Sequence, residues 1–177
     1  MYLRELKKED APFMLEWMHD DSVVHDLQTD FSVKTLDDCI AFIENSLGDK
    51  ENLNMAISDD NDEYMGTVSL KHITKDSAEF AIAIRKCAMG KGYSKYGMDE
   101  IIRYGFMNLG LSSVYWCVSP SNIRAIKFYE KYKYNQVTTD KIVISGGYNE
   151  EQLKRYIWFQ INIDDVDKIE LIKTNND

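Results

Sequence analysis

The hydrophobic positions of this chain follow two periods, and each period predicts one kind of element. Short β-branched and aromatic runs bounded by turn residues are typical of strands, whereas apolar residues three or four positions apart are typical of amphipathic helices. Strands are predicted at Met1–Leu6, Asn52–Ser58, Tyr64–Ile73, Glu79–Ile84, Ser113–Val118, Tyr134–Ser145 and Gln152–Ile163. Helices are predicted from Ala11 to Asp20, from Thr35 to Leu47, from the residues after Gly92 to Leu109, and from Ile123 to Lys131.

The order of these elements predicts the fold class. Antiparallel hairpins come early in the chain and helical crossovers come later, which indicates an α/β fold with a mixed, mostly antiparallel central sheet flanked by helices. The 177 residues suffice for one domain with a substantial core. We expect this domain to span residues 1–163. The acidic C-terminal tail, residues 164–177, is expected to fray unless Ile169, Leu171 and Ile172 dock on the domain.

Two of the predicted helices carry N-terminal signals. Asp10 stands where a cap is expected, and Pro12 occupies an early helical position, which suits the fixed φ of proline. Thr35 and Asp38 have the spacing of a capping box, with aspartate in the place of glutamate.

The most informative stretch joins the Glu79–Ile84 strand to the helix that follows it. Gly90 and Gly92 lie between the two elements. A glycine-bearing turn before a helix suits phosphate, because free N–H groups and the helix dipole favour negative charge there. Two nucleotide-binding patterns fail on spacing. The dinucleotide fingerprint requires glycine where Lys95 stands, and the Walker A loop requires glycine where Arg85 stands.

Two motifs together resemble the GNAT superfamily of N-acetyltransferases. Met89–Ser94 resembles that family's acetyl-CoA loop, which has glutamine or arginine, two residues, glycine, one residue, and then glycine or alanine; Gly92 matches a defining position. Asn122–Lys131 resembles the family's second cofactor motif, an asparagine, an alanine three positions later and an aromatic-Tyr-Glu-Lys run. The motifs occur in the family's order and at about its spacing, so the pair is far more specific than either motif alone.

The resemblance implies acetyl-CoA as the cofactor. It implies that the parallel strands Glu79–Ile84 and Ser113–Val118 splay apart, that the pantetheine arm lies in the gap, and that the loop amides hold the diphosphate. The cofactor-binding residues that it implies are Ile82, Ala83, Ile84, Met89, Gly90, Lys91, Gly92, Tyr93, Ser94, Lys95, Asn122, Ala125 and Tyr129. Ile82 and Ile84 are also interpretable as core residues, and Asn122 as a helix N-cap.

Moving an acetyl group from a thioester to an amine sets three chemical demands. The amine, with a pKa of about 10, must lose a proton, the oxyanion needs donors, and the thiolate, with a pKa of roughly 8.5, is helped by a proton donor. The resemblance implies Tyr129 as that donor; the alternative is one more aromatic side chain on a buried helix face. It implies Glu79 as the carboxylate base, and the alternative is a solvated charge at a strand edge. His72 and Asp76 are weaker candidates for the base.

The chain departs from the family pattern at three places. Met89 replaces glutamine or arginine, so a side-chain contact is expected to be missing there. Ser94 replaces the final glycine or alanine, and its hydroxyl can donate to a phosphate. Lys133 and Tyr134 replace the Gly-Phe pair that normally ends the second motif's helix, so this helix must end without glycine.

The acceptor side is the least determined by the sequence. Trp17–Asp20, Phe31 and the Thr35–Glu44 helix resemble the branch that acetylates amino sugars on nucleotides; the ribosomal-protein-acetyltransferase-like branch is the other one that the chain resembles. We therefore expect a small-molecule primary amine. A polyamine, an aminoglycoside and a protein N-terminus remain alternative acceptors. A non-catalytic acetyl-CoA sensor and a purely structural domain remain alternatives to an enzyme. The resemblance also makes a homodimer an expectation.

Charge and cysteine content argue against several classes of protein. The net charge of −9 argues against a nucleic-acid partner, because phosphate backbones require a basic surface. The three cysteines lack C-x-x-C spacing and the three histidines lack metal-ligand spacing, so neither a disulfide framework nor a metal is expected. No apolar signal region follows Met1 and no apolar run could span a bilayer, so a cytoplasmic protein without a membrane partner is predicted.

Overall fold

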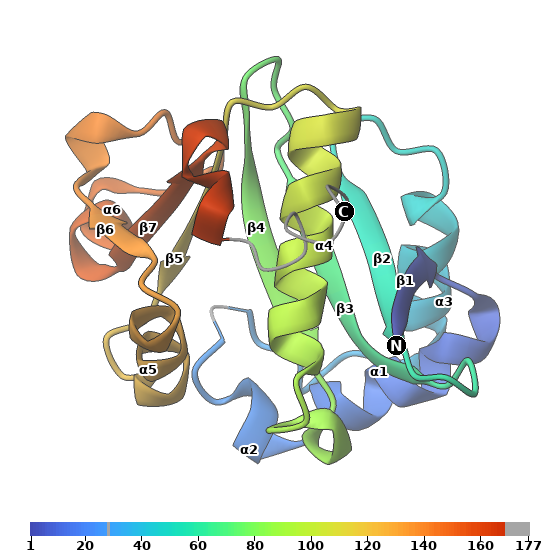
Figure 1. The fold of residues 1–177 in the computed structure, drawn as a ribbon. Helices are drawn as coiled ribbons and strands as arrows, with labels where there is room; N and C mark the ends of the chain where they lie inside the picture. Colours follow the sequence, from blue (N-terminus) through green and yellow to red (C-terminus); the bar gives the residue numbers. More distant parts are fainter. Residues whose placement is uncertain (28, 169–177) are drawn as a thin grey trace.

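The computed structural model describes residues 1–27 and 29–168, and a seven-stranded sheet forms its centre (Figure 1). The strands are β1 Tyr2–Glu5, β2 Leu53–Ser58, β3 Tyr64–Lys71, β4 Ser77–Ile84, β5 Ser113–Val118, β6 Asn135–Val137 and β7 Ile157–Asn162. They lie in the order β1-β2-β3-β4-β5-β7-β6, and all neighbours are antiparallel except β4 and β5. The predicted mixed, mostly antiparallel sheet is confirmed.

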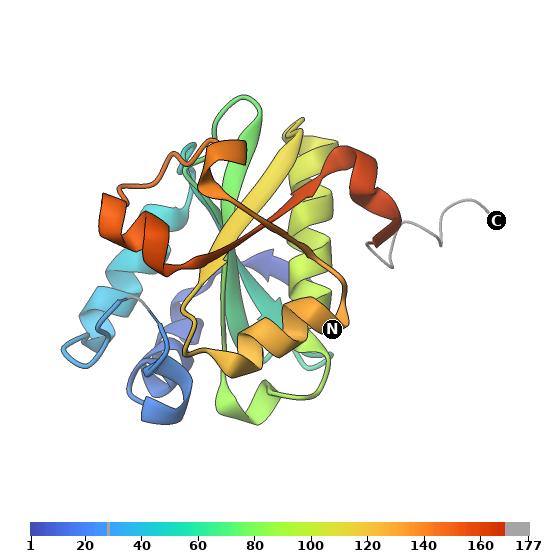
Figure 2. The same cartoon turned by 90° about the vertical axis from the view of Figure 1, so that its left-hand side faces the viewer.

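Helices cover both faces of this sheet. They are α1 Ala11–Met18, α2 Asp21–Val24, α3 Leu36–Ser46, α4 Tyr93–Asn108, α5 Ile123–Lys131 and α6 Glu150–Arg155. In Figure 1, α4 lies in front of the sheet while α1 and α3 lie behind it, and Figure 2 shows the same layers from the side. Short 3₁₀ turns complete the described chain at Lys8–Asp10, Lys86–Ala88, Thr139–Lys141 and Ile163–Lys168.

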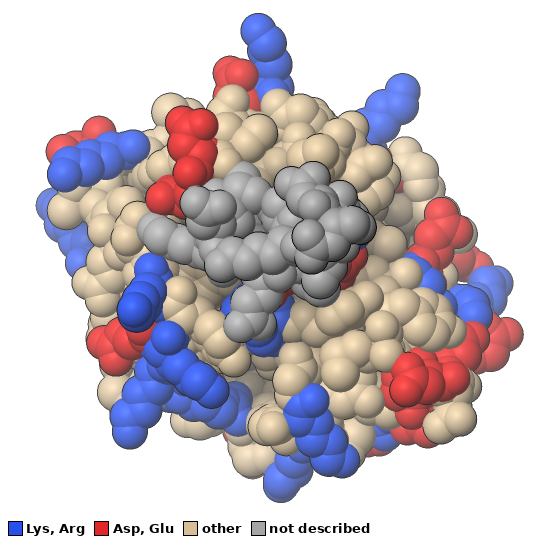
Figure 3. Space-filling view, viewed as in Figure 1, with Lys and Arg blue, Asp and Glu red and all other residues tan. Residues whose placement is uncertain are grey.

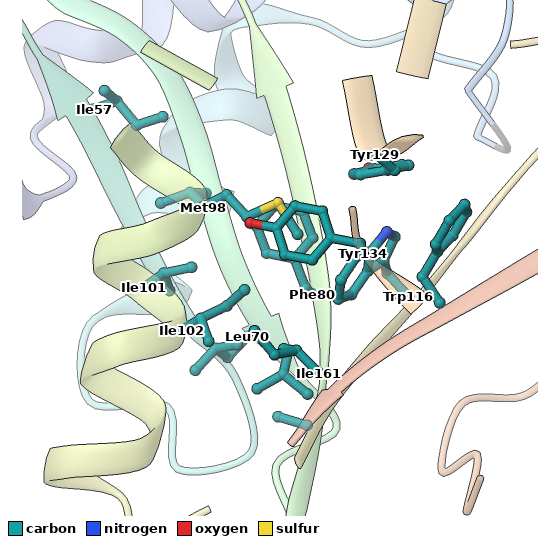
Figure 4. Close-up of a cluster of buried hydrophobic side chains, with 14 of the residues drawn as sticks. Ile57, Leu70, Phe80, Met98, Ile101, Ile102, Trp116, Tyr129, Tyr134 and Ile161 are labelled. Carbon is teal, nitrogen blue, oxygen red and sulfur yellow. The ribbon is translucent and has the colours of Figure 1, made fainter. Parts of the chain in front are cut away.

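The larger hydrophobic core lies between the sheet and α4 (Figure 4). Gly97 lets α4 approach the sheet closely, since a Cβ atom there would lie 2.3 Å from Cδ1 of Ile57. On the same face, Trp116 of β5 stacks on Phe159 of β7 with ring centroids 5.8 Å apart. This tight packing fixes α4 against the sheet and thereby fixes the direction in which its N-terminus points.

The two helix-start signals had different outcomes. The capping box is confirmed, because the Thr35 hydroxyl accepts from the Asp38 N–H at 3.2 Å and the Asp38 carboxylate accepts from the Thr35 N–H at 2.8 Å. The prediction that Asp10 caps α1 is wrong. The buried Asp10 carboxylate accepts from Arg4 at 2.7 Å and from the backbone N–H of Lys7 at 2.8 Å. A buried carboxylate gains more from a guanidinium than from a helix amide, so it ties β1 to the turn before α1.

The last two predicted strands were wrong in extent. The strand predicted over Tyr134–Ser145 pairs only at β6, and Val143, at 77% exposure, faces solvent. Gln152 lies in α6, where its side chain and that of Asn149 form a capping box. The Asn149–Gln152 capping box favours a helix where the apolar pattern favours a strand, and the chain forms the helix. The chain from Thr138 to Asn149 therefore leaves the sheet edge.

Helix α5 ends without glycine, as expected: Lys133 takes the left-handed conformation with φ of 56°, and the Tyr134 N–H donates to the Tyr129 carbonyl at 3.1 Å. The predicted tail begins within the Ile163–Lys168 turn, and its apolar positions Ile169, Leu171 and Ile172 lie outside the described residues.

Candidate active site

The parallel strands β4 and β5 pair over only part of their length. Their partners are Ser77–Ser113, Ala78–Val114 and Glu79–Tyr115. Beyond Glu79, β4 continues to Ile84 without pairing to β5, and Figure 1 shows the two strands diverging towards α5. The backbone groups on that edge of β4 are available to an extended ligand, as they would be to another strand.

A turn with bare amides lies at the open end of this gap. Gly90 and Gly92 have φ values of 75° and 92°, which L side chains rarely adopt. The Lys91 N–H is already used, since it donates to the Ala88 carbonyl at 3.3 Å. In this turn and the first turn of α4, five N–H groups make no hydrogen bond to any described residue: those of Gly90, Gly92, Tyr93, Ser94 and Lys95. They surround the N-terminus of a 16-residue helix, which is the geometry that suits phosphate oxygens.

Side chains around this turn add positive charge. A guanidinium nitrogen of Arg124, on α5, lies 3.0 Å from Sδ of Met89, at the position where the sequence lacks the usual polar residue. Lys and Arg side chains gather over α5 in Figure 3, on a chain whose net charge is −9. The Lys95 ammonium is not part of this group, because it is buried in an ion pair with Asp99. Lys95 can therefore offer a ligand its backbone N–H but not its ammonium.

Helix α5 brings the second motif to the other side of the gap. Asn122 caps the helix, its side-chain oxygen accepting from the Ala125 N–H at 3.0 Å, so the capping interpretation is confirmed. Tyr129 is buried, with its ring centroid 5.3 Å from that of Trp116 and 4.9 Å from that of Phe159. Its hydroxyl makes no hydrogen bond with the described residues. Burial raises the pKa of Tyr129 well above its usual value, with the nearby Cys117 adding to the effect, so the phenol stays protonated at neutral pH.

Glu79 lies where the two strands part. The interpretation of Glu79 as a solvated edge charge is wrong, since only 7% of the residue is exposed. The hydroxyl of Tyr148 donates a hydrogen bond to its Oε1, and the His72 Nε2 lies 3.8 Å from its Oε2. No local pattern pointed to Tyr148, which is 69 residues away along the chain. His72 is thus brought to the candidate base, but neither His72 nor Asp76 lines the cavity at this site.

One cavity of about 920 Å³ joins these features. Ten predicted site residues line it: Glu79, Ile82, Ala83, Ile84, Met89, Gly90, Ser94, Asn122, Ala125 and Tyr129. The predicted Lys91, Gly92, Tyr93 and Lys95 do not line it. The volume lies in the range of sites that enclose small molecules.

The far half of the cavity lies between the sheet and the N-terminal helices. Trp17 and Phe31 form an edge-to-face aromatic pair, with centroids 5.2 Å apart, and α3 contributes Phe42. Asn54 and Ser69 line the cavity from neighbouring strands and hydrogen bond to each other at 2.7 Å. This half therefore offers an aromatic wall and hydrogen-bonding groups to an acceptor.

No group of three or more His, Cys, Asp or Glu side chains in residues 1–27 and 29–168 is arranged to hold a metal ion. Within the same residues, no helix has the length and apolar character needed to cross a membrane.

Comparison with known proteins agrees with this geometry. The acetyltransferase (GNAT) domain profile matches residues 1–135. An uncharacterized N-acetyltransferase, p20, of Bacillus licheniformis is 27% identical over 139 residues, covering 76% of this chain and 78% of that protein.

Solved structures share the fold at low sequence identity. The spermidine N-acetyltransferase of Vibrio cholerae, in complex with CoA and spermine, superposes with a TM-score of 0.76 at 19% identity, covering 93% of this chain and 96% of that one. A dodecameric structure of the Vibrio cholerae spermidine N-acetyltransferase gives 0.66 at 21% identity, covering 91% and 92% of the two chains. Because the domain profile matches well over half of the sequence, this chain belongs to the GNAT acetyltransferase family and is an acetyl-CoA-dependent N-acetyltransferase.

Proposed function

We propose that this enzyme acetylates the primary amine of a small molecule, with Glu79 as the base and Tyr129 as the acid. The observation that carries the proposal is one cavity lined by both side chains and by Gly90 and Ser94 of the glycine turn. Acetyl-CoA fits this arrangement, because the bare amides suit its diphosphate and the unpaired edge of β4 suits its pantetheine amides.

The two titratable side chains divide the proton transfers between them. Glu79 accepts a proton from the ammonium form of the acceptor, directly or through a water molecule, and the freed amine nitrogen attacks the thioester carbonyl. Tyr129 donates its proton to the thiolate sulfur as the carbon–sulfur bond breaks, and it recovers a proton from the nitrogen that has become an amide. The proton on Glu79 passes to solvent. One ammonium and one thioester thus yield one amide, one thiol and one proton.

The far half of the cavity supports an amine that also carries an aromatic and an anionic part, as amino sugars on nucleotides do. Trp17 and Phe31 suit an aromatic ring. Lys34 and Lys71 line the cavity, and Lys71 lies directly opposite Glu79 in the β3–β4 pairing. Because Lys71 is the cross-strand neighbour of the proposed base, its ammonium is well placed to bind an anionic group of the acceptor near the reacting amine.

A polyamine is the second candidate acceptor. The observation in its favour is that the carboxylates of Asp26 and Asp38 line the same cavity as Glu79. Both are already engaged, since Asp26 accepts from Ser121 at 2.9 Å and Asp38 accepts from Thr35. Such carboxylates hold a polycation less well than free ones would. A protein N-terminus is a third candidate acceptor. A homodimer and a cytoplasmic location remain part of the proposal.

The experiment that tests the function combines binding with turnover. Acetyl-CoA should raise the melting temperature of the protein, because a ligand that binds only the folded state stabilises it. Thiol release is then measured with amino-sugar nucleotides, polyamines and N-terminal peptides as acceptors. Release with amino-sugar nucleotides alone supports the preferred acceptor, and release with polyamines alone replaces it. A thermal shift without thiol release from any amine would leave a non-catalytic sensor.

A further inference from the structure

A tyrosine far from both motifs holds the proposed base. We propose that Tyr148 is a positioning residue that fixes one oxygen of the Glu79 carboxylate and leaves the other oxygen to the acceptor amine. This inference rests on the proposed function of Glu79 and extends it to the segment between β6 and α6.

The contacts around the carboxylate carry the inference. The Tyr148 hydroxyl donates to Glu79 Oε1, and it also accepts from the Cys117 thiol, whose sulfur lies 3.6 Å away. Oε2 faces His72 Nε2 at 3.8 Å, which is too far for a hydrogen bond. Glu79, Cys117 and Tyr148 all line the cavity, so the shared hydroxyl lies inside the site.

The segment that carries Tyr148 is built to lie against Glu79. A Cβ atom on Gly146 would lie 2.8 Å from Cε2 of Tyr148 and 3.1 Å from Oε2 of Glu79, so only glycine leaves room for both groups. The N–H of Ser145 donates to the Tyr115 hydroxyl at 3.0 Å, and Tyr115 is the strand partner of Glu79. The segment is therefore anchored to the same point of the sheet as the carboxylate.

Packing against β7 also fixes the ring of Tyr148. It packs edge-to-face on Trp158 of β7, with ring centroids 5.1 Å apart. Trp158 is the strand partner of Cys117, so both lie on the sheet face that carries the contact. Because the ring and the hydroxyl are both fixed, Tyr148 restricts the carboxylate to one orientation and reduces the loss of freedom on reaching the transition state.

The test is a double-mutant cycle on turnover. Tyr148→Phe should lower kcat about tenfold, as expected for a lost hydrogen bond to a carboxylate, with KM for acetyl-CoA unchanged. In a Glu79→Gln background the same substitution should have little further effect, because Tyr148 acts through that carboxylate. Gly146→Ala should also lower kcat, since the added methyl crowds both the ring of Tyr148 and Oε2 of Glu79. Tyr156→Phe is the matched control, a tyrosine whose ring lies 6.4 Å from that of Tyr148 and outside the cavity, and it should leave kcat unchanged.

The outcomes separate this inference from the proposed function. Equal losses from Tyr148→Phe in the wild-type and Glu79→Gln backgrounds would overturn the positioning role alone, because Tyr148 would then act independently of Glu79. An unchanged kcat in Tyr148→Phe would also overturn it. If Glu79→Gln itself turns over like the wild type, the proposed base is wrong and the positioning role falls with it. Melting temperatures of all variants show whether a loss reflects unfolding.

Discussion

Replacing Tyr129 with phenylalanine removes the proposed acid while leaving its surroundings intact. The ring keeps its contacts with Trp116 and Phe159, and the hydroxyl makes no hydrogen bond with the described residues that the change could break. The free energy of unfolding should therefore change by less than about 1 kcal/mol. Any loss of activity can then be assigned to the missing proton donor.

The size of the expected loss follows from the leaving group. General acid catalysis contributes about 10²- to 10⁴-fold, and a thiolate, with a conjugate acid of pKa roughly 8.5, needs less help than an alkoxide. We expect the lower end, a fall of about 100-fold in kcat, which corresponds to about 2.7 kcal/mol of transition-state stabilisation. The affinity for acetyl-CoA should be unchanged, because in the proposed arrangement the glycine turn and the edge of β4 hold the cofactor.

The assay is thiol release measured from about pH 6 to about pH 11 at saturating acceptor, beside calorimetric titration of acetyl-CoA. The acid works only when protonated, and burial raises the pKa of Tyr129 above the ordinary value of about 10. Loss of rate through its deprotonation should thus begin only above that pH. The reasoning is refuted if kcat of Tyr129→Phe equals that of the wild type. It is also refuted if a Tyr129-dependent fall in rate is centred well below about pH 10.

Three further substitutions test other parts of the site. Glu79→Gln should lower kcat/KM for the amine, and an unchanged kcat/KM would shift attention to His72. Gly92→Ala should weaken acetyl-CoA binding about tenfold in calorimetry, because its φ of 92° costs an L residue about 1–2 kcal/mol and the turn must move. Gly48 has φ of 78° but follows α3 instead of lying in the glycine turn, so Gly48→Ala is the control that should lose stability without losing affinity. Lys95→Met should cost at most about 3–5 kcal/mol in urea unfolding, because the buried Asp99 carboxylate loses its ammonium partner but keeps the Tyr134 hydroxyl, 3.4 Å away; a neutral result would mean that this pair is well hydrated.

The parts of the site encoded in short stretches of sequence were predictable. The left-handed conformations of Gly90 and Gly92, the cap at Asn122 and the β-branched strands each depend on residues only a few positions apart. The contact of Tyr148 with Glu79 depends on packing across 69 residues, and no local pattern carries that information. Asp10 shows the same limit of local patterns. Its carboxylate binds Arg4 of β1 and does not cap α1.

The C-terminal third of the chain shows how two local signals compete. Ile142, Val143 and Ile144 have the composition of a strand, but Asn149 and Gln152 start a helix soon afterwards. Because α6 begins at Glu150, the residues between β6 and α6 do not form a second long hairpin with β7. They instead place Tyr148 against Glu79 in the candidate active site.

The early parting of β4 from β5 has a consequence for handling the protein. If the pantetheine arm pairs with β4 as proposed, departure of CoA leaves this stretch of strand edge, in the middle of the sheet, without a hydrogen-bonding partner, and unpaired strand edges favour pairing with other chains. On that proposal, the cofactor-free enzyme is the form most prone to self-association through this edge. Excess CoA in storage buffers should therefore slow the aggregation of concentrated enzyme, even when no acceptor is present.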